Sequence, residues 1–225
     1  MCGRYTLRTK LNLLLSEFAA DLAPGVEWEP RYNIPPTANV PAVRLVDGKR
    51  QLTLFQWGLV PSWAKDTKIA YSTINARADT VATKPAFRTA YKKRRCLVLA
   101  DGYIEWEKSG KDKLPWLYEV EGKPFAFAGL WEAWYGQGEG KPPLESCTII
   151  TTDANELAAK VHNPLRFRGW QRKDQLVLSG SEVLGGHHKI FVSGWPVLWR
   201  FNSCTTTQSK EHCIDTSRWN SDRQQ

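Results

Sequence analysis

Hydrophobic residues recur at helical spacing near the start of the chain and form strand-like runs along much of the rest. In "TKLNLLLSEFAA" the large apolar side chains lie three and four residues apart, at Leu11, Leu14, Leu15 and Phe18. Thr9 precedes this run, and threonine is a common helix cap. The pattern therefore predicts a short amphipathic helix, capped by Thr9, after an N-terminal strand.

Strands account for most of the pattern up to residue 152. "VPAVRLV" and "QLTLFQWGLV" flank "DGKR", which predicts a β-hairpin turned at Asp47-Gly48. We expect further strands in "CLVLADGYIEWE", "PWLYEV", "PFAFAGLWEAW" and "SCTIITT", with a turn at Glu121-Gly122 and a loop over residues 136–143. "RYNIPPT" is predicted to be an extended loop, because its paired prolines exclude helix.

Polar segments separate and follow these strands. "AYSTINARADTVATKPAFRTAYKKRRC" predicts loop and short helix. A further helix is predicted from Asp153, with Glu156 in a capping-box position, and it carries His162. Beyond His162 only "DQLVLSG" and "KIFVSGWPVLWRF" suggest strands, and residues 216–225 are expected to form a loose tail. No stretch reads as a linker, so we expect one strand-rich α+β domain over residues 1–225.

Composition narrows the class of protein. With 42% hydrophobic and 24% charged residues, the chain is typical of a globular protein. No apolar stretch approaches the roughly 20 residues that span a bilayer, and no apolar signal segment follows Met1. We expect no membrane partner and a cytoplasmic location, nucleoid-associated if the protein is bacterial.

Charge and aromatic content favour a nucleic-acid partner. Lys and Arg number 31 against 23 Asp and Glu, a net charge of +8, and the chain has 11 tryptophans. A basic groove with aromatic faces is typical of single-stranded nucleic-acid binding, because phosphates pair with the cations and any base can stack. The alternative is that the tryptophans are core residues and the charge maintains solubility.

The cysteines do not indicate a disulfide framework. Five cysteines are widely spaced and none forms a C-x-x-C pair. A metal site can be drawn from His187, His188, Cys204, His212 and Cys213, but the spacing fits no common zinc pattern. We predict neither a metal nor an organic cofactor.

Cys2, in the opening "MCGRY", is the first candidate for chemistry. Removal of Met1 would give Cys2 a free α-amine beside its thiol, and N-terminal residues of this kind act as nucleophiles in some enzymes. Arg4 lies on the same side of an extended strand as Cys2, which would bring a phosphate-binding charge to the nucleophile.

Two other candidates are titratable. In "GYIEWE", alternation places Glu105 on one strand face with Tyr103 and Glu107. If that face lines a pocket, burial would raise the carboxyl pKa and suit it to proton transfer; the alternative is an ordinary exposed carboxylate. His162 would end the helix from Asp153, either pointing into a cleft or capping the helix.

Asn75 and Arg77, in "INAR", share a face if that segment is extended, where they would offer an amide and a guanidinium fork for phosphate. The run Arg88, Lys92, Lys93, Arg94 and Arg95 is the densest positive segment of the sequence.

Several segments together resemble the SOS-response-associated peptidase (SRAP) family, in the same order and with similar spacing. They are "MCGRY", "RYNIPPT", "WGLVPSW", "INARADT", "KKRRCLVLADGYIEWE", "FAFAGLWE" and "TIITTDAN" followed by "VH", and they cover about residues 1–162. The resemblance implies a β-rich α+β fold, with mixed and antiparallel sheets forming a barrel-like core and a few short peripheral helices. It also implies a DNA-repair protein that shields abasic sites in single-stranded DNA through a covalent link.

The resemblance also implies roles for particular residues. Cys2 would form the link after the protein's own peptidase activity removes Met1, and Asn75, Glu105 and His162 match the family's active-site residues, His162 also serving reversal of the link. Arg4 and Arg77 match positions that hold the DNA backbone. With the stacking and basic side chains, the expected DNA contacts are Arg4, Arg77, Trp63, Trp106, Arg88, Lys92 and Thr151.

The chain departs from the family after His162, where "HNPLRFRGWQRKDQ" replaces an Arg-Met-Pro stretch and an apolar strand. Two other functions stay open. An N-terminal cysteine amidohydrolase would also begin Met-Cys-Gly, and a noncovalent reader of modified DNA bases would use the same basic groove. The resemblance otherwise leads us to expect a monomer that acts on abasic single-stranded DNA.

Overall fold

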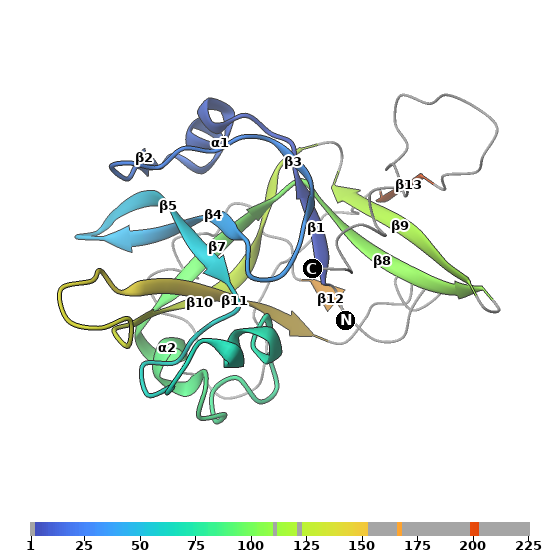
Figure 1. Cartoon of the computed structure of the whole chain (residues 1–225). Helices are drawn as coiled ribbons and strands as arrows, with labels where there is room; N and C mark the ends of the chain where they lie inside the picture. The colour runs from blue at the N-terminus through green and yellow to red at the C-terminus, as the bar shows by residue number, and fades with distance from the viewer. Residues whose placement is uncertain (1–2, 110–111, 121–122, 153–165, 168–198, 203–225) are drawn as a thin grey trace.

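A computed structural model describes residues 3–109, 112–120, 123–152, 166–167 and 199–202. Its strands form two sheets, with the orders β13-β9-β8-β1-β3 and β12-β11-β10-β7-β4-β5-β2, and β6 is added beside β11 (Figure 1). The strands are β1 (Arg4–Leu7), β2 (Asp21–Leu22), β3 (Arg31–Ile34), β4 (Asn39–Val46), β5 (Lys49–Trp57), β6 (Asn75–Arg77), β7 (Arg95–Ala100), β8 (Gly102–Ser109), β9 (Asp112–Val120), β10 (Phe125–Trp134), β11 (Leu144–Thr152), β12 (Arg166–Phe167) and β13 (Trp199–Asn202).

The larger sheet closes on itself. Strands β5, β4, β7, β10 and β11 are joined by antiparallel pairings, and a parallel pairing of β11 with β5 completes the ring. The closing contacts place Ser146 opposite Gln56 and Cys147 opposite Trp57. The expected β-rich α+β fold, with mixed sheets and a barrel-like core, is therefore confirmed.

Helices are short and lie at the periphery of the barrel: α1 (Leu11–Phe18), the 3₁₀ helix η1 (Lys68–Ser72) and α2 (Arg88–Lys93) (Figure 1). The helix predicted after the first strand is present, and it buries Leu14 and Phe18. The predicted Thr9 cap is wrong. Lys10 occupies the capping position without a side-chain hydrogen bond, while the Thr9 hydroxyl donates to Asp101 Oδ2 at 3.1 Å.

The predicted hairpin is also present. β4 and β5 pair from Asn39 opposite Gln56 to Val46 opposite Lys49. Asp47 and Gly48 connect them with φ angles of 51° and 77°, both left-handed, as a two-residue hairpin turn of type I′ requires. The Asp-Gly pair suits this turn because both residues tolerate positive φ.

Other expectations were less accurate. "RYNIPPT", predicted to be a loop, begins with strand β3, because its first four residues precede the prolines and pair with β1. The polar segment before β7 contains the expected loop and short helix but also strand β6. The Glu121-Gly122 turn, the helix from Asp153, the "DQLVLSG" strand and the tail lie outside the described residues. The strand predicted in "KIFVSGWPVLWRF" overlaps β13 at its end.

The main hydrophobic core fills the barrel and extends under β1 and β8. The Tyr5 ring meets Trp57 and Phe127 edge-on, at centroid distances of 5.2 Å and 5.8 Å, and Tyr103 stacks on Tyr118 at 4.9 Å. The two Tyr5 contacts pack the smaller sheet against the barrel, whereas the Tyr103–Tyr118 stack lies within the smaller sheet, between β8 and β9. None of the helices in the described ranges has the length and apolar character needed to cross a bilayer.

"CLVLADGYIEWE", predicted as one strand, is divided between the two sheets. β7 ends at Ala100 in the barrel, and β8 begins at Gly102 in the smaller sheet. A Cβ atom on Gly102 would lie 2.8 Å from Thr6 Oγ1 and 2.9 Å from Leu117 Cδ1, so only glycine fits this junction without displacing its neighbours.

Asp101, between these strands, joins the junction to β1 and to the residues that follow it. Its backbone N–H donates to the Thr6 carbonyl at 2.9 Å, and its carboxylate accepts bonds from the Thr6 and Thr9 hydroxyls at 2.7 Å and 3.1 Å. The backbone N–H groups of Arg8 and Thr9 and the Arg8 Nε also donate to this carboxylate. Asp101 is 5% exposed, so these donors have little access to water as an alternative partner.

We expect Asp101→Asn to lower the free energy of unfolding by about 2–4 kcal/mol, because an amide NH₂ would face donors that now share a buried carboxylate. Urea denaturation followed by circular dichroism measures this loss. Asp21→Asn, at an exposed position of β2, is the matched control and should change stability by less than about 0.5 kcal/mol. Equal effects of the two substitutions would contradict a structural role for the Asp101 carboxylate.

Candidate functional site

The first candidate residues lie where β1 pairs with β8. Arg4 is opposite Ile104 and Tyr5 is opposite Tyr103. Cys2 lies outside the described residues, and one residue separates it from Arg4 in the sequence. β1 begins at Arg4, at the strand end that adjoins Ile104 and Glu105.

Glu105 is buried, with 7% of its surface exposed. It shares a face of β8 with Tyr103, whose ring contacts Phe127 of the barrel core. The alternative of an ordinary exposed carboxylate is therefore wrong. Burial raises the pKa of Glu105, although the positive charge of the amino terminus acts in the opposite direction. A carboxyl group with a raised pKa is suited to exchanging protons closer to neutral pH.

Arg4 approaches the same strand end from the other face of the sheet. Because side chains alternate along a strand, Arg4 and Ile104 share one face while Tyr5, Tyr103 and Glu105 share the opposite one. The Arg4 guanidinium donates through Nη1 to Asn33 Oδ1 at 3.1 Å, so β3 helps to hold its side chain.

Asn75 and Arg77 lie on strand β6, which confirms that their segment is extended. β6 pairs in parallel with β11, with Asn75 opposite Ile149 and Arg77 opposite Thr151. The alternate residue, Ala76, is buried in a separate cluster with Leu59 and Phe87. Asn75 and Arg77 therefore lie on the face of β6 that they share with Ile149 and Thr151.

Trp57 links this strand to β1. Its indole Nε1 donates to the Ile74 carbonyl at 2.9 Å, one residue before Asn75, and its ring meets Tyr5 beside Arg4. Ile149, opposite Asn75, belongs to the same core cluster as Tyr103. Asn75 and Glu105 therefore border one core from two different sheets, although they are 30 positions apart in the sequence.

Arg77 is paired with a carboxylate. Its Nη2 lies 2.6 Å from Asp79 Oδ2, and both side chains are about half exposed. Thr151, the last of the expected DNA contacts, is 1% exposed, and its carbonyl accepts from Ala78 N–H at 2.8 Å. Thr151 thus holds the chain just after Arg77 through its backbone.

The aromatic candidates differ in exposure. Trp63 is 59% exposed, and its Nε1 donates to the Pro85 carbonyl at 3.4 Å, which joins its loop to the segment before α2. Trp106 is half-buried. Trp28, Trp57 and Trp134 are buried, so the core alternative holds for these three.

Fewer of the basic residues at positions 88–95 are exposed than the sequence suggests. Arg88, Lys92 and Lys93 of α2 are exposed. Arg94, in contrast, donates through Nη2 to the buried Glu132 at 2.5 Å, and the Arg95 guanidinium lies over the Tyr91 ring at 5.5 Å. These two arginines therefore interact with other residues of the protein, through an ion pair and a ring contact.

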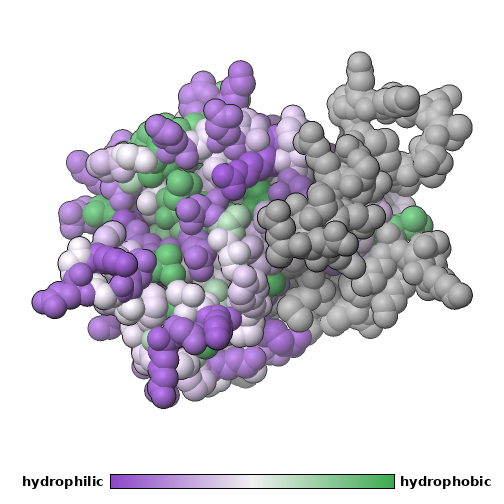
Figure 2. Space-filling view, viewed as in Figure 1, coloured by the Kyte–Doolittle hydropathy of each residue, from purple (hydrophilic) through white to green (hydrophobic). Residues whose placement is uncertain are grey.

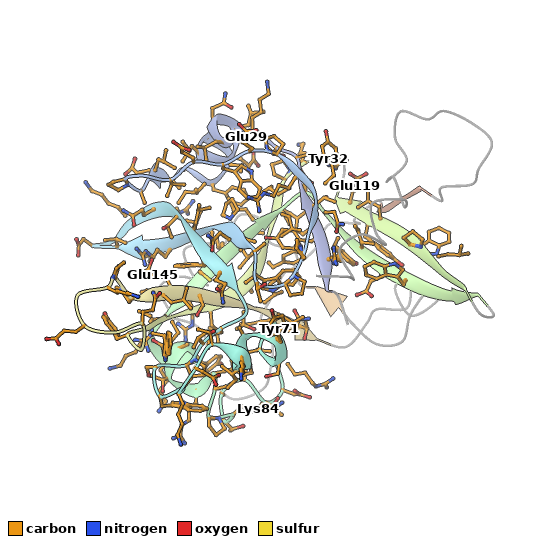
Figure 3. All side chains as sticks on the ribbon, viewed as in Figure 1. Glu29, Tyr32, Tyr71, Lys84, Glu119 and Glu145 are labelled. Carbon is orange, nitrogen blue, oxygen red and sulfur yellow. The ribbon has the colours of Figure 1, made fainter. Side chains whose placement is uncertain are left out.

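Hydrophilic residues cover most of the face that includes α2 and the β4–β5 hairpin, with hydrophobic residues in small groups between them (Figure 2). Tyr71 and Lys84, both exposed, lie on the side of the molecule that carries α2 (Figure 3). This side therefore combines aromatic and basic side chains, as expected for a surface that contacts nucleic acid.

Several candidates lie outside the described residues: His162, and the histidines and cysteines considered for a metal site. Among the residues described, no group of three or more His, Cys, Asp and Glu side chains is arranged to hold a metal ion. Cys96 and Cys147 are fully buried, and burial raises the pKa of both thiols. Their thiols are therefore structural rather than reactive.

Three residues that shape the site could not be singled out from the sequence pattern: Asn33, Asp79 and Asp101. Asn33 and Asp79 lie within "RYNIPPT" and "INARADT", and Asp101 lies in "LADGY". Motif membership was a signal for all three. However, Asn33 binds Arg4, 29 positions away, and Asp101 binds residues of and after β1, more than 90 positions away. Contacts between residues so far apart leave no local pattern in the sequence.

Comparisons with known proteins show the family to which the chain is similar. The family model for SOS response associated peptidase (SRAP) matches residues 1–169. The abasic site processing protein YoaM of Bacillus subtilis is 41% identical over 166 residues, covering 72% of each chain, and the abasic site processing protein YedK of Escherichia coli is 28% identical over 195 residues, covering 81% of this chain and 83% of YedK. A crystal structure of a Bacteroides thetaiotaomicron protein matches with a TM-score of 0.72 and 26% identity, covering 80% of this chain and 82% of that one.

The raised pKa of Glu105 has a consequence for stability. The folded protein holds this proton more tightly than the unfolded chain, so the stabilising contribution is full below the ordinary value of 4.5 and is lost as pH rises through the raised pKa. We expect Glu105→Gln, which stays neutral, to unfold at a higher temperature than the wild type at about pH 7, with the difference shrinking toward about pH 4.

Thermal unfolding across this pH range measures the effect. Glu17→Gln, at an exposed position of α1, is the matched control and should show no such pH-dependent gain. A wild type more stable than Glu105→Gln at neutral pH would contradict the burial argument.

Proposed function

The chain belongs to the SOS response associated peptidase family, and from this premise we propose that it is a DNA-repair protein that captures abasic sites in single-stranded DNA covalently through Cys2. The observation that carries the proposal is the buried carboxyl group of Glu105, next to the residue that pairs with Arg4. A carboxyl group with a raised pKa stands beside the strand end to which Cys2 is tethered.

Capture would begin at the amine. With Met1 removed, the Cys2 α-amine has an ordinary pKa of about 8 and is partly unprotonated at neutral pH. Its nitrogen attacks the aldehyde carbon of the ring-opened abasic sugar, and water leaves to give an imine. The Cys2 sulfur then bonds to the same carbon while the thiol proton passes to the nitrogen, which closes a five-membered thiazolidine.

Each step moves a proton, and Glu105 is the group we assign to this transfer. It would protonate the hydroxyl that leaves as water and accept a proton from the attacking amine. Asn75 would hold the sugar by hydrogen bonds from its amide, since it borders the same core as Glu105. His162 would donate a proton to the sugar ring oxygen during opening and serve reversal of the link.

The DNA strand would be held by charge and stacking. Arg77 would bind a phosphate near the reacting sugar, and Arg4 would bind one at the same strand end from the other face of the sheet. The exposed cations of α2 would extend this contact. Trp63, being exposed beside the segment before α2, would stack on a base. Thr151 would act through its backbone, since its side chain is buried.

Removal of Met1 by the chain itself is the remaining part of the proposal. The amine required for imine formation does not exist while Met1 is attached. Glu105, as the buried carboxyl group beside the strand end, is the residue we assign to assist this cleavage.

We predict that the wild type, incubated with an oligonucleotide carrying one abasic site, gives a shifted band on a denaturing gel, and that Cys2→Ala gives none. Cys2→Ala keeps the other four cysteines, so it is its own control for adventitious thiol reactions. An adduct that survives this substitution, or blocking of the amino terminus, would contradict the proposed chemistry. A noncovalent reader would give no shifted band with either protein.

We also predict that Glu105→Gln slows crosslinking by a factor of about 10²–10⁴, because an amide matches the carboxyl group in shape but transfers no proton. The crosslinking rate on the denaturing gel measures this, and intact mass shows whether Met1 has been removed. Glu17→Gln should react at the wild-type rate. A normal rate for Glu105→Gln with processed protein would remove Glu105 from the mechanism.

A further inference from the structure

The Arg77 guanidinium is engaged by a carboxylate within its own segment. Its Nε lies 3.2 Å and 3.1 Å from the two Asp79 oxygens, and its Nη2 lies 2.6 Å from Oδ2. A guanidinium holds a carboxylate and a phosphate through the same kind of paired N–H donors, and its Nε and Nη2 form one such pair. Asp79 therefore occupies donors that a DNA phosphate would use.

The position of Asp79 is fixed by the backbone around it. Ala78 N–H donates to the Thr151 carbonyl at 2.8 Å, and the N–H groups of Thr80 and Val81 donate to the Arg77 carbonyl at 3.2 Å and 2.9 Å. These bonds form a turn that keeps the Asp79 side chain beside Arg77. The bond from Arg77 also lowers the pKa of Asp79, which keeps the carboxylate charged at neutral pH.

Arg4 provides a contrast. Its Nη1 donates to Asn33 Oδ1, the oxygen of a neutral amide on β3, whereas Arg77 faces a carboxylate within its own segment.

We propose that Asp79 is a specificity-determining residue whose carboxylate competes with DNA phosphate for Arg77 and so weakens noncovalent binding of undamaged single-stranded DNA. This inference rests on the proposed function. A phosphate that binds Arg77 must displace the carboxylate or share the guanidinium with it, so every DNA strand binds less tightly. Abasic DNA is retained nevertheless, because its covalent bond does not depend on Arg77. The competitor thus favours release of intact strands over release of damaged ones.

The test is the affinity of Asp79→Asn for an undamaged single-stranded oligonucleotide, measured by fluorescence anisotropy over a range of salt concentrations. We expect binding about 2- to 5-fold tighter than wild type, the effect of one exposed ion pair. The plot of log affinity against log salt should steepen by about 0.7, as for one more phosphate contact on a single strand.

Asp47→Asn is the matched control, because it removes the same charge from the β4–β5 turn, where asparagine tolerates the left-handed φ of 51°. Equal affinities of the two variants, or weaker binding by Asp79→Asn, would overturn the proposal. In an Arg77→Ala background, Asp79→Asn should have no further effect beyond that of Asp47→Asn, and a retained gain would also overturn it. If the wild type itself neither binds nor crosslinks DNA, the proposed function fails instead.

Discussion

The carboxylate of Asp101 is the constraint on which the relation between the two sheets depends. It stands where the chain leaves the barrel and enters the smaller sheet, and it binds Thr6, Arg8 and Thr9 in and after β1. These bonds hold β1 against β8 without a continuous strand between the sheets. The Arg8 guanidinium also forms an ion pair with Glu119 of β9, which extends the attachment to the next strand. The amino-terminal strand is thereby anchored at the end opposite to the proposed nucleophile.

Barrel closure gives the second half of the site its position. The pairing of β11 with β5 brings Trp57 to the edge of β6, where its indole holds the Ile74 carbonyl. The same ring contacts Tyr5. Asn75 and Glu105 thus border one rigid core, which is what a site needs if its groups are to act together on one sugar.

Electrostatics divides the site into a buried and an exposed part. Glu105 is largely shielded from solvent, which raises its pKa. Its carboxyl group therefore keeps its proton closer to neutral pH. The Arg77 side chain is about half exposed, and its charge is offset by the ion pair with Asp79. Under the proposed function, the buried carboxyl group would transfer protons and the exposed ion pair would moderate binding of the DNA backbone, because exposed ion pairs exchange partners at little cost.

The sequence determined the local elements and the identity of the candidate residues. Periodicity indicated α1, and Asp47-Gly48 specified the hairpin turn, since both depend on neighbouring residues. The ordered motifs identified Cys2, Asn75, Glu105, Arg4 and Arg77. The single-domain and monomer predictions, and the roles of His162, stay predictions. Local pattern failed at Thr9, which binds Asp101 instead of capping α1, and at the division of "CLVLADGYIEWE" between two sheets. Only the tertiary structure decided that Glu105 is buried and that Asn75 borders the same core, because burial depends on packing between residues far apart in the chain.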